Sequence, residues 1–118
     1  MFNTNNKLTI LAIGAHGDDI ELACGGSLAK AVNKGHEVVM VVITGVDSND
    51  HKNVSIRENG NAEKEAKAAA KVLGVTKLII LGYEDTLVPY SAELIAKLDD
   101  IMIKHEPDII FTPPFCKD

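Results

Sequence analysis

Four short apolar runs, separated by helix-length segments, constrain the fold of this 118-residue chain most strongly. The runs are rich in Val, Ile and Leu and occupy residues 8–13, 37–44, 77–82 and 108–112. Near-continuous apolar runs of this length are typical of strands that are buried on both faces of a parallel sheet. The sequence therefore predicts four parallel strands.

Helical patterns fill the three intervals between these runs. The first helix is expected over 22–34, before Gly35, because glycine readily adopts the left-handed conformation at a helix C-terminus. The second begins at residue 59 or 61, shows one alanine-rich face and ends at Gly74. The third is capped by Ser91 and stopped by Pro107. The chain thus alternates strand and helix throughout.

This alternation predicts an α/β fold with right-handed crossovers and helices on both faces of a mainly parallel sheet. The length fits a single domain over residues 1–118, and the 46% hydrophobic content is enough for a core. No helix follows the fourth strand, so an uncovered sheet edge is expected, which favours a homo-oligomer.

Charge and cysteine content narrow the class of protein. The formal net charge of −5 argues against a general nucleic-acid or membrane-surface binder, because such proteins carry a basic excess. The two cysteines, Cys24 and Cys116, form no metal-type pair and are expected to be reduced thiols. With no signal peptide recognisable in the polar start of the chain, we expect a cytoplasmic protein.

A turn with three ionisable side chains follows the first predicted strand. His16, Asp18 and Asp19 lie at the carboxyl end of that strand, the edge where open α/β sheets carry their sites. An imidazole and a carboxylate three positions apart can face one metal ion, which leaves the other carboxylate free to handle a proton. The turn therefore indicates a metal site.

Two other interpretations of the same turn stay open from the residues alone. One aspartate at a helix entrance can simply cap the helix, although capping explains neither His16 nor the second carboxylate. A dinucleotide-binding turn is the other alternative. It lacks the full glycine fingerprint, and adjacent carboxylates would repel a pyrophosphate.

Loops 45–57 and 83–90, and residues from Pro113 onward, are expected at the same edge of the sheet.

Several blocks closely resemble the PIG-L/LmbE family of zinc-dependent N-acetylglucosamine deacetylases, whose signature is Ala-His-Pro-Asp-Asp-x-Glu. The matching blocks cover nearly the whole chain: 15–21 (Ala-His-Gly-Asp-Asp-Ile-Glu), 25–29, 35–38, Arg57 with Glu58, 69–75, 81–85 and 104–113. The resemblance implies a Rossmann-like three-layer α/β/α fold. It also implies a small amino-sugar substrate and a Zn²⁺ cofactor.

The resemblance further implies a role for five residues. His16 and Asp19 would ligate zinc, and Asp18 would be the general base. Arg57 and Asp85 match positions that line the substrate site.

Two departures from the family pattern matter for function. Gly17 replaces the usual proline, and the family's third zinc ligand lies in a His-x-Asp-His block after the fourth strand, which these 118 residues do not contain. We therefore expect the chain to be the N-terminal portion of a larger fold. The predicted function is removal of an N-acetyl group from an N-acetylglucosamine-type amino sugar. The alternative is a catalytically incomplete fragment or a sugar-binding module without turnover.

Overall fold

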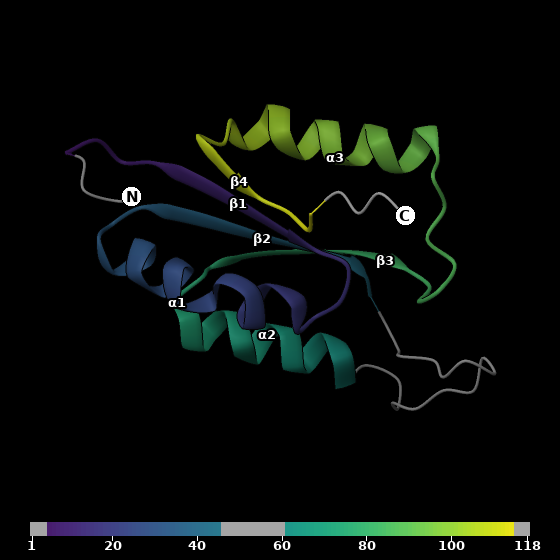
Figure 1. Ribbon diagram of the computed structural model, residues 1–118, viewed down its shortest axis with the longest axis horizontal. Coiled ribbons are helices and arrows are strands. Elements are labelled where there is room, and N and C mark those ends of the chain that lie inside the picture. The colour runs from purple at the N-terminus through teal and green to yellow at the C-terminus, as the bar shows by residue number, and fades with distance from the viewer. Residues whose placement is uncertain (1–4, 46–60, 115–118) are drawn as a thin grey trace.

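A four-stranded parallel sheet forms the centre of the molecule (Figure 1). The computed structural model describes residues 5–45 and 61–114. The strands lie in the order β3-β2-β1-β4, and their bounds are β1 Thr9–Gly14, β2 Glu37–Thr44, β3 Lys77–Tyr83 and β4 Ile109–Phe111. All four predicted strands are therefore confirmed, within one or two residues at each end.

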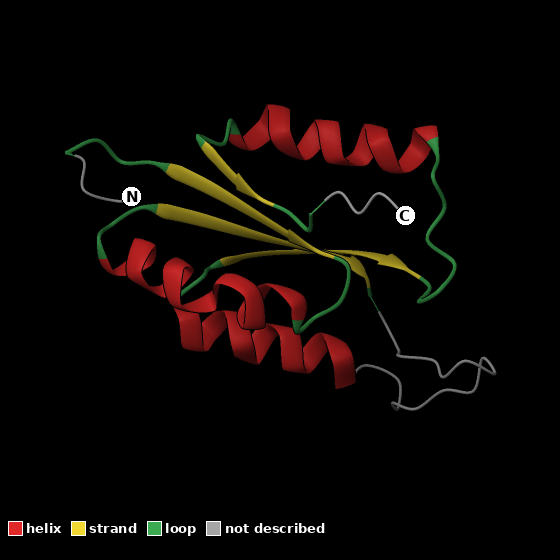
Figure 2. Cartoon of the chain, in the orientation of Figure 1, coloured by secondary structure: helices red, strands yellow, loops and turns green. Residues whose placement is uncertain are grey.

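Within the described residues, three helices cover the two faces of this sheet (Figure 2). Helices α1 (Asp19–Asn33) and α2 (Asn61–Leu73) pack side by side on one face. Helix α3 (Ala92–His105) lies on the opposite face. The predicted three-layer α/β/α arrangement is confirmed. Helix α1 begins three residues earlier than the sequence predicted and carries a kink at Cys24, whose φ is −143°.

Strand β1 carries the centre of the core because it lies between β2 and β4. Ile10 and Ala12 point into a cluster with Leu28 of α1 and Ala70 of α2, whereas Leu11 points toward Ile101 of α3. Alternate residues of a strand face opposite sides of its sheet, so β1 contributes to both layers. All three of these β1 side chains are fully buried, which confirms burial on both faces for this central strand. The edge strands β3 and β4 are only partly buried, so the prediction was wrong for them.

The helix ends follow local chemistry. The hydroxyl of Ser91 accepts a hydrogen bond from the Leu94 backbone N–H (3.2 Å), as a helix N-cap requires. After α1, Gly35 adopts a φ of +86°, the left-handed conformation predicted for it. Helix α3 ends differently, because Glu106 rather than a glycine takes this conformation with a φ of +46°.

None of the helices in the described ranges is both long and apolar enough to cross a membrane.

Candidate active site

The turn between β1 and α1 is attached to the end of β2. Both the backbone N–H and the hydroxyl of Thr44 donate hydrogen bonds to the Ala15 carbonyl oxygen, at 2.9 and 2.8 Å. Gly14 allows the chain to fold back tightly, since a Cβ there would lie 2.9 Å from Ile20 Cγ1. The turn is therefore fixed at the carboxyl edge of the sheet, where the sequence predicted it.

His16 and Asp19 face one another across this turn. Asp19 Oδ2 accepts a hydrogen bond from the His16 backbone N–H at 3.0 Å, and the same oxygen lies 3.7 Å from His16 Nδ1. Their side chains are 46% and 42% exposed. A nitrogen and a carboxylate oxygen so placed can bind one small cation from the solvent side. The structure thus brings together the two predicted metal ligands.

Asp85 meets the other nitrogen of the same imidazole. Its Oδ1 lies 2.6 Å from His16 Nε2 and also accepts a hydrogen bond from the Thr86 backbone N–H at 2.9 Å. The Asp85 side chain is only 12% exposed. It comes from the loop that follows β3, 69 residues away from His16 in sequence. The sequence placed Asp85 at this edge but did not predict its contact with His16.

The neighbouring carboxylates create a negative electrostatic potential around His16, which favours a positive charge there. The pKa of His16 is raised, chiefly by the hydrogen bond to Asp85 and against a smaller effect of burial. The negative charges of Asp19 and Asp18 raise the pKa further. A divalent cation would meet the same favourable field.

Asp18 stands at the N-cap position of α1 but makes no capping hydrogen bond with its side chain. Its carboxylate is exposed and lines a depression of about 280 Å³ between α1 and α2. Helix capping therefore does not account for this residue. Nearby, both carboxylate oxygens of Glu21 are buried without a hydrogen-bond partner among the described residues, and burial raises the pKa of this group.

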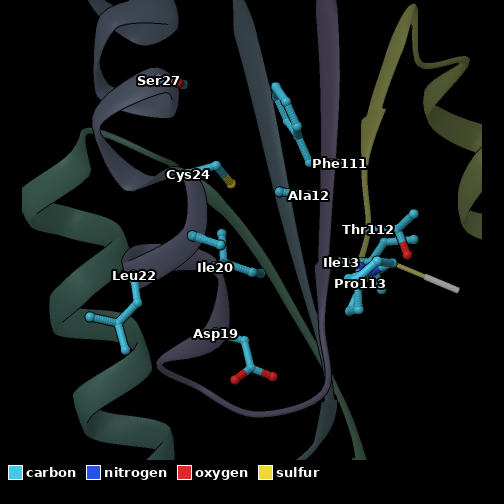
Figure 3. A pocket seen from close by; sticks show the side chains of 12 residues that line it. Ala12, Ile13, Asp19, Ile20, Leu22, Cys24, Ser27, Phe111, Thr112 and Pro113 are labelled. Atoms are coloured by element: carbon cyan, nitrogen blue, oxygen red, sulfur yellow. The ribbon is translucent and has the colours of Figure 1, made fainter. Parts of the chain in front are cut away.

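A largely apolar groove opens on the other side of the turn (Figure 3). It has a volume of about 720 Å³ and runs between α1 and the end of β4. Ile20, Leu22 and Cys24 line its α1 wall, Phe111 and Pro113 line the facing wall, and Asp19 lies at one end. The predicted metal ligand Asp19 and predicted base Asp18 thus border different hollows.

Other predicted positions contribute less to the described site. Arg57 and Cys116 lie outside the described residues, so the expectations for them stay predictions. Within residues 5–45 and 61–114, no three His, Cys, Asp or Glu side chains converge on a point that could hold a metal ion. His36 is buried and accepts a hydrogen bond from the Leu8 N–H.

Comparison with known families agrees with this geometry. The sequence model of the PIG-L family, described as GlcNAc-PI de-N-acetylase, matches residues 11–118. The chain belongs to the PIG-L family. The predicted family resemblance is therefore confirmed.

Three relatives show how much of a family member the chain represents. It is 37% identical over 106 residues to the uncharacterized deacetylase YaiS of Escherichia coli, covering 89% of this chain and 54% of YaiS. It is 31% identical over 111 residues to the diacetylchitobiose deacetylase of Thermococcus kodakarensis, covering 92% and 42%. The N,N'-diacetylchitobiose deacetylase of Pyrococcus horikoshii, solved with its inhibitor MPG, superposes with a TM-score of 0.78 at 32% identity. That superposition covers 92% of this chain and 41% of the other. The chain therefore spans about half the length of these relatives.

Proposed function

We propose that this chain carries part of the active site of a zinc-dependent N-deacetylase. The reaction is hydrolysis of the N-acetyl group of an N-acetylglucosamine-type sugar or conjugate, which gives the free amine and acetate. One observation carries the proposal: the 3.7 Å approach of His16 Nδ1 to Asp19 Oδ2 at the sheet edge, in a member of the PIG-L family. The similarity to diacetylchitobiose deacetylases supports the choice of substrate class.

The donor set fits zinc, which accepts imidazole nitrogen and carboxylate oxygen. His16 and Asp19 would hold the ion, and a zinc ion there would acidify a water molecule and polarise the acetyl carbonyl. A catalytic zinc usually has three protein ligands. The described residues supply two, so we propose that the third comes from outside them.

Asp18 is the proposed general base. Its exposed carboxylate makes no capping bond, and its negative charge contributes to the raised pKa of His16, which supports a position near the proposed metal site. In this role Asp18 takes a proton from the attacking water and delivers it to the departing sugar nitrogen. Arg57 is proposed to contact the sugar, and the family resemblance offers Asp85 as a second candidate contact. The proposed setting is cytoplasmic, with no nucleic acid or membrane as partner.

Acetate release from N-acetylglucosamine and diacetylchitobiose, measured together with zinc content, tests this function. General-base catalysis contributes about 10²–10⁴-fold. Asp18→Asn should therefore lower the rate by at least about 100-fold while zinc content is retained. Asp99→Asn is the matched control, because Asp99 is an exposed aspartate on α3. If Asp18→Asn retains the full rate, Asp18 is not the base.

A second candidate function is sugar binding without turnover. It is favoured by the presence of two rather than three converging metal-ligand side chains in the described part of the chain. Retained binding of diacetylchitobiose, with zinc supplied and no acetate released, would select this candidate over the enzyme.

A further inference from the structure

We propose that Asp85 is a positioning residue that makes Nδ1 the metal-binding atom of His16. By accepting the Nε2–H of the imidazole, its carboxylate leaves Nδ1 directed toward Asp19. This inference rests on the proposed function, because it assumes that a zinc ion binds at His16 and Asp19. It adds which atom of His16 binds the ion and which residue decides that choice.

The distances separate a hydrogen bond from a pair of metal ligands. Two ligand atoms about 2.0–2.1 Å from a tetrahedral zinc lie about 3.4 Å apart. The 2.6 Å between His16 Nε2 and Asp85 Oδ1 is too short for such a pair and is typical of a charge-assisted hydrogen bond. The 3.7 Å between His16 Nδ1 and Asp19 Oδ2 is only slightly wider than a ligand pair requires.

Asp85 is held in place independently of the metal site. Its Oδ1 also accepts the Thr86 backbone N–H, and the Leu87 N–H donates to the Glu84 carbonyl at 3.1 Å, which closes a turn around it. Thr86 adopts a φ of +68°, a conformation that is costly for a β-branched residue. Such strain persists where surrounding contacts over-determine it, commonly at functional sites. Contacts within its own loop therefore hold this carboxylate in position.

This arrangement has a chemical consequence. A carboxylate behind a ligating histidine fixes the ring orientation and increases the basicity of the ligating nitrogen. Removal of such a partner typically weakens metal binding about 10–100-fold. Because Oδ1 is already occupied by His16 and Thr86, the role differs from a direct contact with the sugar.

Nitrogen NMR of the unmutated 118-residue chain tests the choice of atom. With Zn²⁺ alone added, we expect the His16 Nδ1 resonance to shift on coordination, while Nε2 stays protonated and coupled to its hydrogen. Without metal, the Nε2–H should appear as a slowly exchanging, downfield-shifted proton. Coordination through Nε2 would overturn the inference. Because this measurement needs no variant, it does not depend on how a substitution affects folding.

Zinc affinity, measured by competition with a chromophoric chelator, tests the role of Asp85. Asp85→Ala should weaken Zn²⁺ binding about 10–100-fold and abolish the downfield Nε2–H signal. Asp85→Asn keeps an oxygen that can accept the Nε2–H, so it should weaken binding less and move the signal upfield without abolishing it. Glu84→Gln is the matched control, since it alters an exposed carboxylate in the same turn. Unchanged zinc affinity in Asp85→Ala with only KM raised would overturn the inference and make Asp85 a substrate contact.

His16→Ala separates the inference from the function beneath it. If His16→Ala leaves zinc affinity unchanged, the proposed metal site itself is wrong. If His16→Ala abolishes binding while Asp85→Ala has no effect, only the positioning role fails.

Discussion

Replacement of Gly45 by alanine should destabilise the protein and disturb the site together. A Cβ at residue 45 would lie 2.4 Å from Gly82 Cα and 3.0 Å from Ile80 Cγ2, so the clash is partly with backbone that cannot rotate away. Relief requires the ends of β2 and β3 to separate by about 1 Å. Overpacking of this kind costs about 1–3 kcal/mol.

A lost hydrogen bond adds to this cost. The Gly45 N–H donates to the Tyr83 carbonyl at 3.1 Å, and a net loss of about 1 kcal/mol accompanies its rupture. The expected decrease in unfolding free energy is about 2–4 kcal/mol. For a chain of this length the unfolding entropy is about 250 cal/mol/K, so Tm should fall by about 8–16 °C. Because Gly82 and Tyr83 lead directly into the Asp85 turn, the His16 Nε2–H signal should also broaden.

Gly26→Ala is the matched control for this experiment. Gly26 is exposed in α1, and a Cβ there would meet no atom within 4 Å. Alanine should therefore raise the unfolding free energy by about 0.5–1 kcal/mol through its better helix propensity. Thermal and urea unfolding followed by circular dichroism measure both variants. A Gly45→Ala protein as stable as the parent chain would refute the close strand approach on which this reasoning depends.

Three further outcomes are expected in urea unfolding. Leu28→Ala should lower the unfolding free energy by about 2–5 kcal/mol because the side chain is fully buried. The control Val72→Ala, at a position that is 86% exposed, should change it by less than about 0.5 kcal/mol. Equal effects of the two substitutions would contradict the described core. Ser91→Ala should cost about 1 kcal/mol through loss of the α3 cap, and no loss would mean that water replaces the cap fully. Lys77 lowers the pKa of Glu37 through a 2.6 Å hydrogen bond. Because the pKa of Glu37 is lowered, the ion pair stabilises the fold when the pH is above the ordinary carboxyl pKa of 4.5. This stabilisation is lost as the pH falls through the lowered pKa. Lys77→Ala should therefore cost less than about 1 kcal/mol at pH 7, and this deficit should shrink as pH falls below 4.5. A deficit that does not change with pH would exclude this ion pair as its cause.

The sequence alone determined most of the architecture, because the relevant signals are local. Apolar runs located the described strands, and helical periodicity located the helices between them. The predicted run 37–44, for example, coincides with β2. Gly35 and Ser91 were identifiable as helix ends, since their conformational freedom and hydrogen bonding act within a few residues. The parallel order then placed His16, Asp18 and Asp19 at the functional edge of the sheet.

The sequence did not predict the backbone conformation at two helix positions where tertiary contacts outweigh the intrinsic preference of the residue. Nothing in the sequence indicated that Glu106 would take the left-handed conformation, or that α1 would begin at Asp19 and kink at Cys24. Tertiary contacts adjoin both places: Cys24 packs against the core cluster under α1, and Asp108, two residues after Glu106, accepts a hydrogen bond from the Thr9 N–H of β1. Intrinsic preference for a residue type is a small energy by comparison.

Only the tertiary structure decided how the candidate site is assembled. The resemblance to deacetylases singled out Asp85 as a substrate contact, yet its nearest described partner is His16 Nε2, 69 residues away. That contact depends on the neighbouring positions of β1, β2 and β3 and on the strained turn at Thr86. Such pairing across the carboxyl edge has no periodicity or spacing to reveal it, because it arises from crossovers rather than from adjacency in the chain. The sequence thus supplied the candidate ligands of the proposed metal site, and the fold turned Nδ1 of His16 toward Asp19 and Nε2 toward Asp85.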